Sequence, residues 1–213
     1  NKQVAVFNSS MEFLGTFGND DLRSPYGITF YKQENNSYKV LVTDSYEYNN
    51  PREDRVLSWD FTIENEEFSV GPATVLGNPT LYQVESIQAD KHYQTLLVAE
   101  EMKEHHKVMA LDLMTGEVIK EDLGNFDRGN DPEGIALVIN KDNNGYWICT
   151  EQSKTDNRFH LYDRKTLEYK TTMYLDNVSY TDGIATAYMH GKWFLYAVDN
   201  DARVVAFELP EIN

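Results

Sequence analysis

The sequence is poor in cysteine and in basic residues, and it contains no long apolar run. Its single cysteine excludes an internal disulfide framework and a zinc site built on cysteine pairs. Only 19 Lys and Arg stand against 35 Asp and Glu, and the formal net charge of −16 repels nucleic acid and anionic lipid. No stretch approaches the roughly 18 apolar residues of a membrane-spanning helix. We therefore expect no nucleic-acid partner and no membrane insertion.

Aromatic and other hydrophobic residues are plentiful. Hydrophobic residues make up 41% of the 213 residues, and aromatic residues 13%, which favours one folded domain over a disordered acidic chain. Cys149 lies in the apolar run Tyr146–Cys149, so we predict that it is a buried core residue. N-x-S/T sequons occur at Asn8, Asn35 and Asn177, which is compatible with secretion. We expect a secreted or extracellular protein.

A strand-like segment recurs through the whole chain. Its copies begin at Gln3, Arg55, Lys107, Arg158 and Arg203, with spacings of 52, 52, 51 and 45 residues. Each copy reads as a short strand that ends in a polar turn, as in Arg55–Asp60 and Lys107–Asp112. Two further repeated strands precede each full copy and a fourth follows it. Four short strands in about 50 residues indicate a β-propeller, in which each blade is a small antiparallel sheet.

The repeat predicts an all-β propeller in one domain, residues 1–213, with about four and a half blades. The expected bounds are 1–17 for a partial blade, 25–78, 83–124 and 131–177 for full blades, and 181–209 for the last blade. The chain opens with the third and fourth strands of a blade and ends with the first three of another. Val4–Phe7 is therefore either a spare strand on a four-bladed ring or part of a blade completed upstream. We favour the second alternative, which gives five or six blades in the intact protein.

Acidic residues recur at equivalent positions of the repeat. One set, at the start of the innermost strands, consists of a tyrosine and three acids, namely Tyr26, Glu85, Glu133 and Asp182. A second set, at the ends of the next strands, contains Asp44, Glu100, Glu151 and Asp199. Innermost strands line the channel of a propeller, so like charges would converge there, and a cation with oxygen ligands would neutralise them. Calcium takes 6–8 oxygen ligands and is the cofactor that we expect. The alternative is that the acids are solvated turn residues.

Several motifs resemble those of the β-propeller phytases. Asp131-Pro132-Glu133-Gly134-Ile135, followed by Gly145-Tyr146 and Leu161-Tyr162-Asp163-Arg164, is similar to that family's D-x-E-G…GY…IYDR stretch. Thr181-Asp182-Gly183-Ile184 resembles T-D-G-I, Val98-Ala99-Glu100-Glu101 resembles I-A-E-E, Tyr26-Gly27 resembles Y-G-F, and Glu85 falls at the Glu of T-E-G. The motifs occur in order from about Tyr26 to Phe207, so the resemblance covers most of the chain.

The resemblance implies a calcium-dependent phosphomonoesterase that acts on phytate. The calcium ligands it implies are Glu85, Glu100, Asp131, Glu133, Asp182 and Asp199. Tyr26 would contact calcium or phosphate, and either Glu100 or Glu101 would orient the attacking water. The expected partner is a small phosphorylated substrate such as phytate.

One departure from the family pattern concerns positive charge. The phosphate-binding lysine of the family's V-T-G-K turn is replaced here by Asp44-Ser45. The family's further basic ligands, a lysine and an arginine, come from its first two blades, which we expect to be absent or incomplete in this sequence. A second hypothesis therefore stands beside the phosphatase. In it the protein is a non-catalytic, calcium-stabilised extracellular propeller that serves as a scaffold or as a module for a protein or other ligand.

Overall fold

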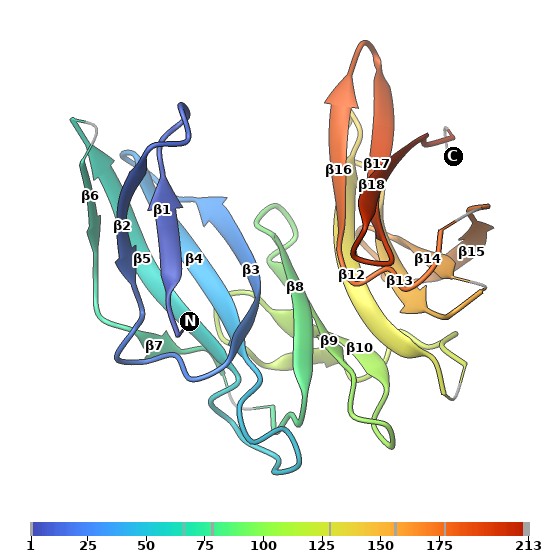
Figure 1. Cartoon of the computed structure of the whole chain (residues 1–213), viewed down its shortest axis with the longest axis horizontal. Helices are drawn as coiled ribbons and strands as arrows, with labels where there is room; N and C mark the ends of the chain where they lie inside the picture. Colours follow the sequence, from blue (N-terminus) through green and yellow to red (C-terminus); the bar gives the residue numbers. More distant parts are fainter. Residues whose placement is uncertain are drawn as a thin grey trace.

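The fold is built from antiparallel β-sheets that follow one another along the chain (Figure 1). The structure is a computed structural model and describes residues 2–65, 67–77, 79–127, 129–155, 157–176 and 178–210. Over these ranges there is no helix, and hence none that could cross a membrane. The all-β propeller arrangement predicted from the repeat is confirmed. Asn8 and Asn35 lie in turns or loops, whereas the sequon at Asn177 falls outside the described residues.

Four blades form the body of the molecule. The first contains β3 (Pro25–Lys32), β4 (Ser37–Asp44), β5 (Val56–Glu64) and two short outer strands that both pair with β5, namely β6 (Glu67–Val70) and β7 (Thr74–Val75). The second contains β8 (Val84–Asp90), β9 (Thr95–Glu100), β10 (Lys107–Asp112) and β11 (Val118–Lys120). The third contains β12 (Asp131–Ile139), β13 (Gly145–Gln152), β14 (Arg158–Asp163) and β15 (Tyr169–Tyr174). The last contains β16 (Ile184–Met189), β17 (Lys192–Asp199) and β18 (Arg203–Glu208).

The two ends of the chain lie in different sheets. β1 (Val4–Phe7) and β2 (Phe13–Phe17) form a two-stranded sheet, and Phe17 packs edge-on against Trp59 of the first blade. Among the described residues, β18 pairs only with β17. Figure 1 shows β1 and β2 on the left and β16–β18 on the right. The last blade thus has three strands, as the repeat predicts.

The hydrophobic core lies between successive blades. One cluster joins the first and second blades through residues such as Leu41 and Leu96, and another joins the third and fourth through residues such as Ile148 and Leu195. Cys149 is fully buried between the second and third blades, which confirms the prediction for this residue. This packing places the inner strands β3, β8, β12 and β16 side by side in that order.

Candidate metal centre

The inner strands begin with β-bulges. Pairing of the inner strand with its neighbour is irregular over residues 25–28, 84–87 and 132–135. Tyr26, Glu85 and Glu133 lie inside these three bulges, and Asp182 lies two residues before β16. A bulge turns a side chain away from the regular alternation of a strand and is frequent beside functional sites. The bulges therefore orient the side chains of Tyr26, Glu85 and Glu133.

Glycines allow the blades to approach each other closely at the same level. A Cβ on Gly27 would lie 2.5 Å from the carbonyl oxygen of Glu85. A Cβ on Gly134 would lie 2.8 Å from the backbone nitrogen of Ile184 and 3.2 Å from the carbonyl oxygen of Asp182. Only glycine fits such contacts, which bring Glu85 and Asp182 against the inner strand of the preceding blade.

The carboxylates repel one another at this level. Burial, followed by repulsion from Glu85 and Glu101, raises the pKa of Glu133 to about 10. Burial, followed by the nearby Glu101 carboxyl, raises the pKa of Glu85. Burial also raises the pKa of Asp131 and of Asp182, both of which repel the Glu133 carboxylate. We call Glu85, Glu101, Asp131, Glu133 and Asp182 the carboxylate cluster.

Tyr26 belongs beside the carboxylate cluster although its strand lies in the first blade. Partial burial, then the charges of Glu133 and Glu85, raises the pKa of the Tyr26 phenol. The phenol is therefore protonated at neutral pH and faces the carboxylates. The structure brings together Tyr26 and four of the six metal ligands that the resemblance implies.

Three polar side chains that the sequence did not single out as ligands contact the carboxylate cluster. Gln83 Nε2 donates to Glu85 Oε1 at 3.1 Å and also to Glu101. Gln152 Nε2 donates to Asp182, and His106 Nε2 lies 3.2 Å from Asp131 Oδ1. The repeat carried a signal for Gln152 as well as for the cluster member Glu101. Glu101 and Gln152 each follow the acid that ends the second strand of their blade.

Glu100 and Asp199, the other two ligands that the resemblance implies, contact backbone loops instead of the carboxylate cluster. Each of the four strand-ending acids accepts a backbone N–H from the loop before the inner strand of its own blade, and we call them the loop-anchoring acids. The contacts are Arg23 N to Asp44 at 3.0 Å, Tyr82 N to Glu100 at 2.7 Å, Asp127 N to Glu151 at 3.2 Å, and Ser179 N to Asp199 at 2.9 Å. These contacts account for the repetition of the acids without a metal.

The oxygen atoms of the cluster suit a hard cation. Glu85 and Glu133 are each 3% exposed, and within the described residues Glu85 Oε2 and Glu133 Oε2 have no hydrogen-bond partner. Over the same residues, no group of three or more His, Cys, Asp or Glu side chains is arranged so that it could hold a metal ion. Buried carboxylate oxygens without partners are costly, and a calcium ion with oxygen ligands would satisfy them. The donor set fits calcium.

The part of the chain that carries the carboxylate cluster matches a known protein family. The family model described as Phytase matches residues 75–191, a range that contains all five members of the carboxylate cluster. None of the curated proteins matches the chain.

Several solved structures share the fold. A nidogen/laminin complex gives a TM-score of 0.61 at 17% identity, covering 94% of this chain and 65% of that one. A thermostable family-43 glycoside hydrolase gives 0.58 at 13% identity, covering 83% and 63%. An exo-β-1,3-galactanase from Phanerochaete chrysosporium gives 0.57 at 10% identity, covering 97% and 50%. The chain spans less than two thirds of each of these structures, and at these identities the likeness concerns the fold alone.

Proposed function

Because this chain belongs to the phytase family, whose model matches more than half of it, we propose that it is a calcium-dependent phosphomonoesterase acting on phytate or a related phosphorylated small molecule. The observation that carries the proposal is the carboxylate cluster, with buried, unpartnered oxygens on Glu85 and Glu133. In keeping with the sequons at Asn8 and Asn35, we propose that it acts outside the cell.

Residues from three successive blades would hold the metal. We assign Glu85, Asp131, Glu133 and Asp182 as calcium ligands, with the Tyr26 phenol beside them. Bound calcium would offset the charge of the substrate phosphate and polarise a bound water. Gln152 orients the Asp182 carboxylate through its hydrogen bond, as outer-shell amides commonly do.

Glu101 is our candidate for orienting the attacking water. It is partly exposed, hydrogen-bonds with Gln83 and faces Glu85, whereas Glu100 is 1% exposed and accepts the Tyr82 amide. In the reaction the water oxygen forms a bond to phosphorus, the ester P–O bond breaks, and the alcohol leaves with a proton. The role of Glu101 is to hold the water in line with the breaking bond, which is a positioning contribution.

The second candidate function is a calcium-stabilised propeller without catalysis. It is favoured by Ser45, which stands where the family has a phosphate-binding lysine and whose buried Oγ has no hydrogen-bond partner among the described residues. A phosphatase without that lysine depends more heavily on calcium to offset the substrate charge.

Phosphate release separates the two candidates. We expect the protein to release phosphate from phytate and from p-nitrophenyl phosphate in calcium, and to lose this activity in excess chelator. Glu133→Gln should abolish most of the release, whereas Glu34→Gln, which changes an exposed acid, should preserve it. No release, together with a calcium-dependent rise in melting temperature, would favour the non-catalytic propeller. A protein indifferent to calcium in both assays would contradict both functions.

A further inference from the structure

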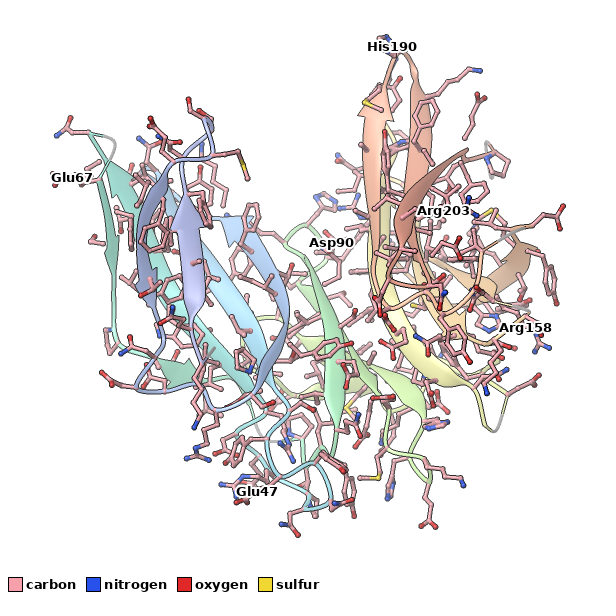
Figure 2. The ribbon with its side chains drawn as sticks, in the orientation of Figure 1. Glu47, Glu67, Asp90, Arg158, His190 and Arg203 are labelled. Carbon is pink, nitrogen blue, oxygen red and sulfur yellow. The ribbon has the colours of Figure 1, made fainter. Side chains whose placement is uncertain are left out.

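A cavity of about 820 Å³ lies between the third and fourth blades, at the end of the propeller where β12 and β16 finish. It is bordered by the β12–β13 hairpin, by the β16–β17 hairpin and by the segment that follows β18, and we call it the hairpin cavity. Figure 2 shows His190, at the tip of the β16–β17 hairpin, at the opposite end of the molecule from Glu47 in the loop after β4. The carboxylate cluster lies where the inner strands begin, so the two sites are separate. A cavity of this volume can hold a drug-sized ligand.

Two aromatic rings line the hairpin cavity together. Tyr188 and Trp193 lie opposite each other in the β16–β17 pair, with ring centroids 5.4 Å apart and planes at 59°. Tyr188 is 48% exposed, and Trp193 packs partly buried against the core between the third and fourth blades. The backbone N–H of Leu209 donates to the Trp193 carbonyl oxygen at 2.8 Å, which fixes the segment after β18 beside the rings. These rings offer a ligand flat apolar surface on which to stack.

Tyr146 brings a hydroxyl without a partner to the same cavity. Its side chain lies in β13, is 2% exposed and lines the cavity. Burial raises the pKa of the Tyr146 phenol to about 12, and within the described residues no hydrogen bond to the hydroxyl offsets that burial. Buried tyrosines usually hydrogen-bond, as the Tyr162 hydroxyl does to the Gly124 carbonyl oxygen. The Tyr146 hydroxyl is therefore available to a ligand in the cavity.

The charged side chains that line the hairpin cavity cancel one another. Lys141 and Lys192 stand against Asp142 and Glu208, two cations against two anions. Lys192 Nζ lies 2.7 Å from Glu208 Oε1, so one pair is already formed. A charged ligand would find no net opposite charge here, and the net charge of −16 of the whole chain further opposes an anion. The Asn140 carboxamide, which also lines the cavity, supplies both donors and an acceptor.

The cavity is shaped by contacts within the protein itself. Thr186 Oγ1 donates to the Leu137 carbonyl oxygen at 2.7 Å and joins the inner strands of the third and fourth blades. Arg164 donates to the Asn143 carbonyl oxygen at 2.6 Å, and its guanidinium also pairs with the buried Asp90 of the second blade. Both contacts hold the β12–β13 hairpin in place. A cavity formed in advance spends less binding free energy on ordering.

We propose that the hairpin cavity binds a neutral saccharide. The rings of Tyr188 and Trp193 suit the apolar C–H face of a sugar ring, while the Tyr146 hydroxyl and the Asn140 carboxamide suit its hydroxyl groups. A wholly apolar ligand would leave these polar groups unpaired. An organic cation would meet two lysines, and an anion two acids. The inference goes beyond the proposed function, because it needs neither calcium nor the carboxylate cluster.

Trp193 makes binding measurable. Of the three tryptophans, Trp59 and Trp147 are 2% and 0% exposed, so acrylamide quenches mainly the fluorescence of Trp193. An array of neutral and anionic glycans, probed with the protein in calcium buffer, selects a ligand, and fluorescence titration with the free oligosaccharide gives its Kd. We expect a neutral glycan to bind and to shield Trp193 from acrylamide. Binding to anionic glycans alone, binding to none, or binding that leaves the quenching unchanged would overturn the inference.

Tyr146→Phe tests whether the free hydroxyl serves the ligand. We expect the Kd of the selected glycan to rise about tenfold, which corresponds to about 1.4 kcal/mol and to one neutral hydrogen bond. The melting temperature should stay that of wild type, because the hydroxyl has no partner to lose. Tyr162→Phe, in the neighbouring strand β14, is the matched control and should lower the melting temperature while preserving the Kd.

Tyr188→Ala tests the aromatic wall at an exposed position, where the variant should fold normally. We expect it to raise the Kd of the same glycan at least as much as Tyr146→Phe does. Neither variant should alter phosphate release, so failure of the proposed function and failure of this inference are distinguishable. A Kd within twofold of wild type for both variants would overturn the inference.

Discussion

Gly27 of the first blade lies directly against the backbone of Glu85 in the second. Thr43 Oγ1 joins them, because it accepts the Gly27 N–H at 2.7 Å and donates to the Glu85 carbonyl oxygen at 2.7 Å. The inner strands of two blades are thus fixed to each other at the level of the carboxylate cluster. The position of Glu85 depends on a contact that no side chain larger than hydrogen would allow at residue 27.

Gly27→Ala is expected to disturb both stability and metal binding. The added methyl group would meet the Glu85 carbonyl, and such overpacking costs about 1–3 kcal/mol. We expect a lower melting temperature and a smaller rise on addition of calcium. Gly71→Ala is the matched control, because its Cβ would meet Asp60 Cβ at an ordinary 3.7 Å. Similar melting curves for the two variants would contradict the role of the close contact.

The effect of Glu133→Gln on the melting temperature is expected to change sign when calcium is added. In excess chelator the variant should melt above wild type, because the raised pKa of Glu133 means that its carboxyl must take up a proton on folding at neutral pH, and glutamine removes this cost. In calcium it should melt below wild type, because calcium affinity depends on the number of charged ligands. Differential scanning calorimetry in both conditions measures this. Glu34→Gln, on an exposed turn, should show neither effect. A parallel shift of Glu133→Gln in both conditions would count against a metal centre.

Glu100→Ala distinguishes a loop anchor from a metal ligand. Loss of the Glu100 carboxylate leaves the Tyr82 N–H unpaired and Lys107, 3.5 Å away, without this partner, so we expect a cost of about 1.5–3 kcal/mol. The melting-temperature rise produced by calcium should equal that of wild type. A variant that no longer responds to calcium would instead make Glu100 a ligand, as the family resemblance implies.

The contacts of Asp54 with Arg52 and Tyr46, in the loop of residues 45–55 between β4 and β5, should loosen at acid pH. The hydrogen bond from Arg52 holds the pKa of Asp54 at about 2, below its ordinary value of 3.8. A lowered pKa contributes stability above the unfolded-state pKa, and that stability disappears as the pH falls from about 4 to 2. The pair is partly exposed, so we expect at most about 1 kcal/mol. Hydrogen exchange of residues 45–55 should speed up over this range in wild type but not in Asp54→Asn, which lacks the titrating group.

The fold was accessible from the sequence because each blade repeats the same motif. The starts of β3, β8 and β12 follow the repeated element closely, since those strands pack in equivalent positions around one axis. The outer edge of the first blade was harder to predict. Gly71 and Pro72 separate β6 from β7 there, and proline cannot donate a ladder hydrogen bond.

The site was predictable only in part. Glu85, Glu133 and Asp182 share a register position, so their convergence follows from the repeat. The repeat does not show whether a strand-ending acid faces the channel or the loop before the inner strand. Glu100 and Asp199 face that loop. The meeting of Arg23 and Arg52 at Tyr46 and Asp54 was beyond reach of the sequence, because both arginines lie outside the repeated strands.

Because Cys149 is buried, the reaction of its thiol with a reagent can report when the structure around it opens. The thiol is fully buried in β13, and burial raises its pKa, so the reactive thiolate is suppressed in the native state. Because the chain has one cysteine, every modification by a thiol reagent reports the same event, the separation of the second and third blades around β13. The rate of labelling under native conditions therefore measures the free energy of that separation without a denaturant. A ligand that ties these blades together through Glu85 and Glu133 would slow the labelling.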